Sequence, residues 1–142
     1  AFASGLGAYG ELYPGAREVL DALVAAPTVS LALVTNGLSE VQRARIDRLG
    51  LGRYFEVIAI SSELGTAKPA PAIFEIALAG LGAPAKRSAL MVGDSLSSDI
   101  QGGRNAGIAT CWYNPQRRSG GGDGLADHEI ATLDTLLAFV RA

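Results

Sequence analysis

Short, nearly continuous apolar runs alternate with helical patterns along most of this chain. The runs typical of strands buried on both faces span residues 29–35, 56–61, 88–93 and 108–112. Apolar residues recur with helical spacing at residues 15–26, 39–49, 71–81, 97–106 and 133–140. Units of one strand and one helix repeat every ~25–30 residues, as they do in right-handed βαβ crossovers. The sequence therefore predicts an α/β fold with a doubly wound parallel sheet.

Length, charge and cysteine content exclude several classes of protein. The 142 residues are 49% hydrophobic, which suits one domain with a core of its own. A net charge of -2 provides no positive field for nucleic acid or anionic lipid. A single cysteine, Cys111, cannot form an internal disulfide, and no apolar run is long enough for a membrane helix or follows a basic leader. We expect a cytoplasmic protein without nucleic-acid or membrane partners, while its oligomeric state is left open.

Polar residues follow the first predicted strand at the point where its helix begins. Thr35, Asn36 and Gly37 occupy this turn, and Ser39 is positioned to cap the helix. A hydroxyl beside the free N–H groups of a helix start makes an anion site. An ordinary Asn-Gly bend is the alternative interpretation of the same residues.

Two carboxylates follow the third predicted strand. Asp94 comes directly after it, and Asp99 lies five residues later in the first turn of the next helix. Converging carboxylates supply the hard oxygen ligands that Mg²⁺ requires. Alternatively, Asp94 caps that helix and Asp99 offsets its dipole. Glycines at 102, 103 and 107 predict close packing of this helix on the sheet.

Lys68 precedes a proline and a predicted helix. Pro69 biases it toward extended geometry, so its side chain is expected to project from a loop above the sheet. Most loop lysines are solvated charges. However, of the 12 basic residues only Lys68 and Lys86 are lysines, so a compact ammonium stands at 68 where this chain otherwise uses arginine.

Taken together, these three groups of residues indicate a site more specifically than any one of them alone. In doubly wound sheets, ligands lie beyond the carboxyl ends of the strands, where Thr35, Lys68 and the aspartates are all predicted to lie. A hydroxyl, a cation and metal ligands at one edge indicate a pocket for a phosphate and a magnesium ion.

Three motifs in this chain resemble those of the haloacid dehalogenase (HAD) superfamily. They are Val34-Thr35-Asn36-Gly37, then Lys68-Pro69 ahead of a helix with Ile73-Phe74, and Gly93-Asp94-Ser95-Leu96-Ser97-Ser98-Asp99-Ile100 followed by Gly102-Gly103 and Ala106-Gly107. The stretch from residue 12 to residue 112 is similar to the helical-cap branch, which includes pyrimidine 5'-nucleotidases and phosphoglycolate-phosphatase-like enzymes. The resemblance implies a Rossmann-like core and a Mg²⁺-dependent phosphomonoester hydrolase.

The resemblance also implies roles for individual residues. Thr35 would hydrogen-bond the transferring phosphoryl group beside the N–H groups of Asn36 and Gly37. Lys68 would neutralise the phosphoryl oxygens and the attacking carboxylate. Asp94 would bind Mg²⁺, and Asp99 would orient the ion through water or hold the loop.

One family motif is absent. The nucleophile of the family is the first Asp of an Asp-x-Asp pair after the first strand, whereas no two of this chain's Asp residues are separated by a single residue. We therefore expect residues 1–12 to be the tail of a helical cap segment and residues 13–142 to be a HAD-like core without its first central strand. The remaining strands would then run 108–112, 88–93, a gap, 29–35 and 56–61, with the strands beside the gap unpaired.

The sequence leaves more than one function open. The first hypothesis is a HAD-type phosphatase acting on a small phosphorylated metabolite, with nucleoside monophosphates as one candidate, whose nucleophile lies outside this sequence. The alternative is a non-catalytic phosphate- or metal-binding interaction domain. Thr35 and Asp94 disfavour a hydrolytic dehalogenase. The resemblance implies that dehalogenating members of the family carry serine at the position of Thr35 and lack the metal-site aspartates. Outside these motifs, Cys111 is expected to be a buried structural thiol and His128 a surface or strand-edge residue.

Overall fold

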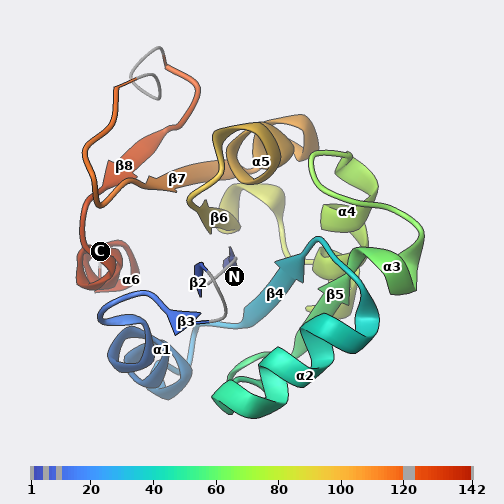
Figure 1. The fold of residues 1–142 in the computed structure, drawn as a ribbon. Coiled ribbons are helices and arrows are strands. Elements are labelled where there is room, and N and C mark those ends of the chain that lie inside the picture. Colours follow the sequence, from blue (N-terminus) through green and yellow to red (C-terminus); the bar gives the residue numbers. More distant parts are fainter. Residues whose placement is uncertain (1, 5–6, 9–10, 120–123, 142) are drawn as a thin grey trace.

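A computed structural model describes residues 2–4, 7–8, 11–119 and 124–141. At its centre is a six-stranded sheet in which every neighbouring pair is parallel (Figure 1). In spatial order the strands are β5 (Val57–Ile60), β4 (Leu31–Thr35), β1 (Phe2–Ser4), β6 (Leu90–Gly93), β7 (Ala109–Tyr113) and β8 (His128–Ile130). This arrangement confirms the predicted α/β class and the parallel sheet.

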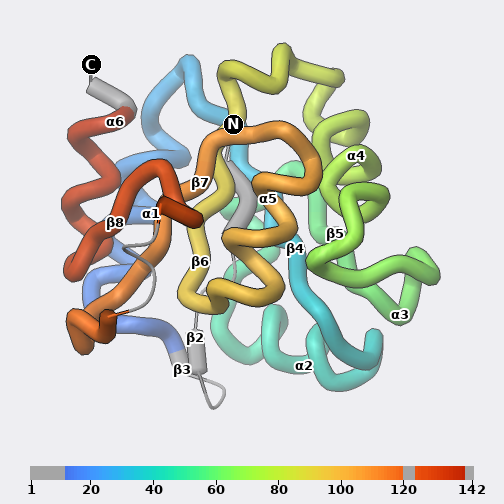
Figure 2. Tube along the Cα trace, turned by 90° about the horizontal axis from the view of Figure 1, so that it is seen from above, coloured from blue at the N-terminus to red at the C-terminus, as the bar shows by residue number. Residues whose placement is uncertain are grey.

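Helices cover both faces of the sheet (Figure 1). They are α1 (Ala16–Ala25), α2 (Ser39–Leu49), α3 (Ser61–Leu64), α4 (Pro71–Gly80), α5 (Gln101–Ala106) and α6 (Leu137–Arg141). The 3-10 turns are η1 (Gly52–Tyr54), η2 (Lys86–Ser88) and η4 (Leu133–Leu136), and η3 (Leu96–Ile100) is a π turn. Seen from above, α6 lies beside α1 at one end of the molecule (Figure 2). No helix in the described ranges is long and apolar enough to cross a membrane.

The core is divided into two layers by the sheet, and β4 illustrates why. Leu31 and Leu33 pack with α1, α2 and η4, whereas Ala32 and Val34 pack with α4 and α5. Because side chains alternate along a strand, both faces of β4 must be apolar when both are covered. The continuous apolar runs of the sequence follow from this arrangement.

Two local predictions differ from the structure. Ser39 does not cap α2: the helix is preceded by Leu38, and the Ser39 hydroxyl donates to Glu63 Oε2 at 2.6 Å. Residues 97–106 are not one regular helix, because η3 is a wide π turn in which the N–H groups of Asp99 and Ile100 both donate to Ser95 O, at 2.9 and 3.1 Å. Such single wide turns occur frequently at functional sites.

The N-terminal segment differs most from its prediction. As expected, β4 and β6 do not pair with each other, but the predicted gap between them is filled by β1. The register sets Phe2 opposite Leu31 and Leu90. Instead of a helical tail, the described residues that follow form the antiparallel pair β2 (Gly7–Ala8) and β3 (Glu11–Leu12). The exposed edges of two central strands carry unpaired N–H and C=O groups, and one extended segment satisfies both edges at once.

Candidate active site

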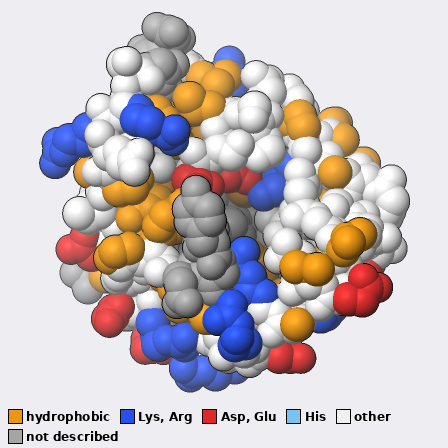
Figure 3. All heavy atoms as spheres, viewed as in Figure 1, with side chains coloured by type: hydrophobic (Ala, Val, Ile, Leu, Met, Phe, Trp, Pro, Cys, Tyr) orange, Lys and Arg blue, Asp and Glu red, His pale blue; other side chains and the backbone are white. Residues whose placement is uncertain are grey.

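The loops that follow three strands surround one cavity at the carboxyl edge of the sheet. The cavity has a volume of about 210 Å³. The predicted site residues Thr35, Asn36, Lys68, Asp94 and Asp99 all line it. Acidic and basic side chains also meet near the centre of one face of the molecule in the space-filling view (Figure 3). The fold therefore brings together residues that are up to 64 positions apart, from Thr35 to Asp99.

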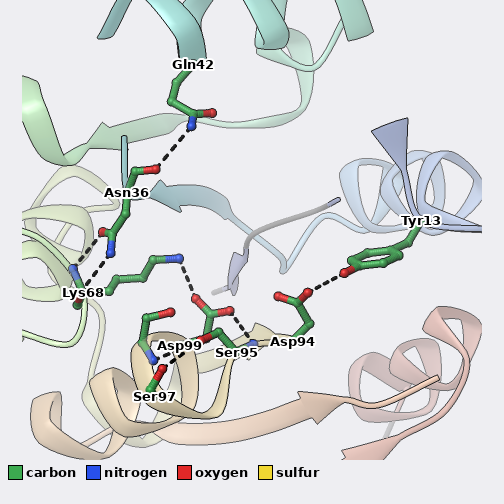
Figure 4. A network of polar contacts seen from close by, with 9 residues as sticks. Tyr13, Asn36, Gln42, Lys68, Asp94, Ser95, Ser97 and Asp99 are labelled. Carbon is green, nitrogen blue, oxygen red and sulfur yellow. Dashed lines mark hydrogen bonds and ion pairs between the residues drawn. The ribbon is translucent and has the colours of Figure 1, made fainter. Parts of the chain in front are cut away.

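Lys68 and Asp99 form a buried ion pair. Lys68 Nζ lies 2.5 Å from Asp99 Oδ1, and the two side chains are only 7% and 3% exposed (Figure 4). The other oxygen of Asp99 accepts the N–H of Ser95 at 3.1 Å. Burying an ion pair is favourable only when further hydrogen bonds satisfy the charged groups. Here the Ser95 N–H provides such a hydrogen bond to Asp99. Lys68 is therefore not the solvated loop charge of the alternative interpretation.

Asn36 holds the loop that carries Lys68. Its Oδ1 accepts the N–H of Lys68 at 2.9 Å, and its Nδ2 donates to the carbonyl of Lys68 at 3.0 Å. Gln42 Nε2 donates in turn to the carbonyl of Asn36 at 3.2 Å (Figure 4). The sequence predicted a role only for the backbone N–H of Asn36, and this role of its side chain was missed. An amide side chain that hydrogen-bonds both the N–H and the C=O of one residue fixes the backbone orientation of that residue.

The backbone N–H of Gly37 does not have the environment that was predicted for it. Its N–H was expected to be free for a phosphoryl group, but it donates to Ser61 Oγ at 2.9 Å. The hydroxyl of Ser61 also donates to the carbonyl of Gly37 at 3.3 Å. The serine at the start of α3 therefore satisfies this turn internally, so that Gly37 joins the β4 and β5 loops instead of presenting a free donor.

Asp94 is held at two points. Tyr13 donates its hydroxyl to Asp94 Oδ2, and Trp112 Nε1 donates to the backbone carbonyl of Asp94 at 3.0 Å. Burial and the neighbouring Asp94 carboxylate raise the pKa of Tyr13 well above its ordinary value. Asp94 does not cap the following helix, because Ser95 Oγ accepts the N–H of Ser98 at 3.2 Å. Tyr13 was not predicted as a site residue, because it lies 81 positions from Asp94 and carries no local signal of the contact.

Glycines allow the close approach of η3 and α5 to the sheet. A Cβ on Gly93 would overlap the Asp99 carboxylate. A Cβ on Gly102 would lie 2.6 Å from Phe74 Cε2, and one on Gly103 would lie 2.6 Å from Thr110 Cγ2. The predicted close packing on the sheet is therefore confirmed at Gly103, whereas Gly102 packs against α4 and Gly107 ends the helix with a φ of 78° and no close contact to the sheet. The same need for a missing Cβ applies to Gly93 beside the ion pair.

Asp94 is the carboxylate best suited to a metal ion. Both oxygens of Asp99 are engaged by Lys68 and Ser95, whereas Asp94 Oδ1 has no hydrogen-bond donor among the described residues. The same residues contain no cluster of three or more His, Cys, Asp or Glu side chains that could bind a metal. Mg²⁺ is commonly held by one or two carboxylates, with waters and substrate phosphate completing its octahedron. The donor set would fit Mg²⁺ in that mode, with Asp94 as the candidate protein ligand.

Two residues outside the cavity behave as predicted. Cys111 is fully buried in β7, and burial raises the pKa of its thiol to about 12. Such a thiol is a poor nucleophile, as expected for a structural cysteine. His128 is exposed in the edge strand β8, and its ring packs edge-on against Phe139 with centroids 4.7 Å apart.

Fold and site together define a doubly wound α/β protein with a lysine, two aspartates and a threonine around one cleft. The sequence family described as haloacid dehalogenase-like hydrolase matches residues 4–107. The chain therefore belongs to the haloacid dehalogenase-like hydrolases, which confirms the resemblance drawn from its motifs.

Individual relatives agree with this family. Over 105 residues the chain is 46% identical to pyrimidine 5'-nucleotidase YjjG of Escherichia coli (strain K12), covering 74% of this chain and 46% of that protein. It is 37% identical to pyrimidine 5'-nucleotidase PynA of Streptococcus pneumoniae, covering 90% and 54%. The magnesium-bound structure of the HAD hydrolase YfnB from Bacillus subtilis superposes with a TM-score of 0.84 at 31% identity, covering 94% and 57%. The chain thus spans about half the length of the curated relatives it matches.

Proposed function

We propose that the complete protein is a Mg²⁺-dependent phosphomonoester hydrolase that acts on a small phosphorylated metabolite. Nucleoside monophosphates are the first candidate substrates, because two of the relatives are named pyrimidine 5'-nucleotidases. The observation that carries the proposal is the buried Lys68–Asp99 pair at the same cavity as Asp94, whose Oδ1 has no hydrogen-bond donor among the described residues. A fixed ammonium next to a metal ligand suits a phosphoryl group and its counter-ion.

Each cavity residue has a role in this proposal. Lys68 sets its positive charge against the phosphoryl oxygens, and Asn36 and Asp99 hold it in place. Thr35 offers its hydroxyl to the same oxygens. Mg²⁺, when bound to Asp94, would offset charge on the phosphate and on the attacking group. Because such interactions are aimed before substrate arrives, they cost no reorganisation during the reaction.

The attacking group is not among these residues. The family resemblance implies an aspartate that forms an aspartyl-phosphate, and a carboxylate nucleophile splits one difficult step into two easier ones. The sequence contains no Asp-x-Asp pair, so the proposal requires a nucleophile from residues outside this sequence. Here β1 occupies the central strand position that the nucleophile follows in the family, so in the complete protein that nucleophile-bearing segment must take the place of β1 or reach the cavity by another path.

The test is phosphate release from para-nitrophenyl phosphate and from nucleoside monophosphates by the complete protein, with Mg²⁺ and with EDTA. Asp94→Asn should lower the rate by orders of magnitude and leave the fold intact, because it removes the charged metal ligand. The matched control is Asp134→Asn, which changes an exposed aspartate in η4 and should leave the rate unchanged.

Full activity in EDTA, or in Asp94→Asn, would overturn the metal assignment. Binding of inorganic phosphate or Mg²⁺ without turnover of any phosphomonoester would instead support a non-catalytic binding domain.

A further inference from the structure

Tyr13 is the one aromatic hydroxyl that contacts a carboxylate of the cavity in the described part of the chain. It donates to Asp94 Oδ2 from the segment between β3 and α1 (Figure 4). None of the roles assigned above to the cavity residues accounts for this contact. The hydrogen bond from Tyr13 occupies Oδ2, one of the two carboxylate oxygens of the proposed metal ligand Asp94.

Tyr13 is held in place through its backbone and through its ring. Its backbone carbonyl accepts the N–H of Ala16 at 3.0 Å, which joins it to the start of α1. Its ring packs edge-on against the buried ring of Tyr113, with centroids 4.9 Å apart. A hydroxyl carried on such a ring has little freedom to leave Asp94, since edge-to-face aromatic pairs are themselves favourable.

The Asp94 backbone is held as well. The indole of Trp112, which is only 1% exposed, donates to the Asp94 carbonyl at 3.0 Å. With its carbonyl held by Trp112 and Oδ2 held by Tyr13, the carboxylate has a defined direction. Only Oδ1 is left for another partner among the described residues.

We propose that Tyr13 is a positioning residue that restricts Asp94 to a single open oxygen and thereby favours Mg²⁺ over Ca²⁺ at this site. Mg²⁺ takes single carboxylate oxygens in a compact octahedron, whereas Ca²⁺ is larger and is often clasped by both oxygens of one carboxylate. Hydrogen-bond partners behind a metal ligand commonly change metal affinity by about 10–100-fold. This inference rests on the proposed function, in which Asp94 is the metal ligand.

The test is titration calorimetry of the substrate-free protein with MgCl₂ and, separately, with CaCl₂. Tyr13→Phe should weaken Mg²⁺ binding by about tenfold, since it removes the donor that orients Asp94. The variant should weaken Ca²⁺ binding less, because the freed Oδ2 can join as a second ligand, so the preference for Mg²⁺ narrows. The matched control is Tyr113→Phe, which removes a hydroxyl from the same aromatic pair and should leave both affinities close to those of the parent.

Thermal unfolding of Tyr13→Phe without metal distinguishes a positioning role from a purely structural one. A purely structural role would lower the unfolding midpoint of the variant but leave its preference for Mg²⁺ over Ca²⁺ unchanged. An unchanged preference in Tyr13→Phe, or an equal change in Tyr113→Phe, overturns the inference. If the parent protein binds neither ion, the metal assignment of the proposed function fails and this inference fails with it. If the parent binds Mg²⁺ and Tyr13→Phe behaves like the parent, only the inference about Tyr13 fails.

Discussion

Two ion pairs lie at the same edge of the sheet and differ in how far they are exposed to water. Lys68 and Asp99 meet at 2.5 Å with side chains 7% and 3% exposed, beside the cavity. Arg43 and Glu63 meet at 2.8 Å with side chains 47% and 31% exposed, where α2 faces α3. Both join segments at least 20 residues apart. Similar distances therefore coexist with very different access to water.

The difference in burial implies different roles. An exposed pair gains little, because water and salt screen it and two long side chains must be ordered. A buried pair is costly to desolvate, and the loss of one partner leaves an uncompensated charge in the interior. Water exclusion also strengthens the field of a buried cation on any neighbouring anion. We infer that the Lys68 pair serves the site and that the Arg43 pair only fastens two helices.

The largest effect is expected on activity. In the complete protein, if it hydrolyses phosphomonoesters as proposed, Lys68→Met should lower turnover by about 10²–10³-fold, because it removes a fixed charge aimed at the phosphoryl group. Lys68→Arg should not rescue it, since a planar fork cannot replace a compact ammonium between anions. Steady-state assays of both variants beside Arg43→Met, which should match the parent, check this. An Arg variant within a few-fold of the parent would reduce Lys68 to a generic positive charge.

Stability should distinguish buried from exposed pairs. Asp99→Asn should lower the free energy of unfolding by about 3 kcal/mol, because Lys68 is left charged and buried. Glu75→Gln is the control, since Glu75 and Lys86 are 2.7 Å apart with side chains about half exposed. That change should cost less than about 1 kcal/mol. Urea unfolding of both variants measures the contrast, and equal losses would contradict it.

A glycine that touches the buried pair offers a smaller test. Gly93→Ala should cost about 2 kcal/mol, because the added methyl overlaps Asp99 and the packed loop must move. Gly52→Ala adds the same methyl where no atom lies within 4 Å and should be nearly neutral. Thermal unfolding of the two variants compares them. A parent-like midpoint for Gly93→Ala would show that the loop yields freely.

The exposed pair should give the smallest effect, visible through pH. Hydrogen bonds from Arg43 and Ser39 lower the pKa of Glu63 from 4.5 to about 2. A lowered folded-state pKa contributes stability above the ordinary pKa, and that contribution is lost as the pH falls from about 4.5 toward 2. The small difference in melting temperature between the parent and Glu63→Gln should therefore shrink between pH 6 and pH 3. A difference that stays constant would argue against the pair.

Much of the fold could be predicted because buried parallel strands carry a local signal. The strand at residues 31–35 lies within the predicted 29–35, and α2 has its predicted bounds, Ser39–Leu49. The order of the four predicted strands is also as expected. The short strand β8 was missed, since three residues at an edge show too little periodicity. The strand β1 was missed because Phe2–Ser4 has no strand pattern of its own and pairs only because two open edges flank it.

The sequence by itself placed Thr35, Lys68, Asp94 and Asp99 at one edge of the sheet, where they line one cavity, because each follows a strand whose pattern is visible and the carboxyl ends of parallel strands share one edge. Only the tertiary structure decided how those groups are used. It pairs Lys68 with Asp99, satisfies the N–H of Gly37 with Ser61, and directs Tyr13 onto Asp94. These contacts join segments 24 to 81 positions apart. No local pattern encodes them, because hydrogen bonds between distant segments depend on how the helices and loops pack against the sheet.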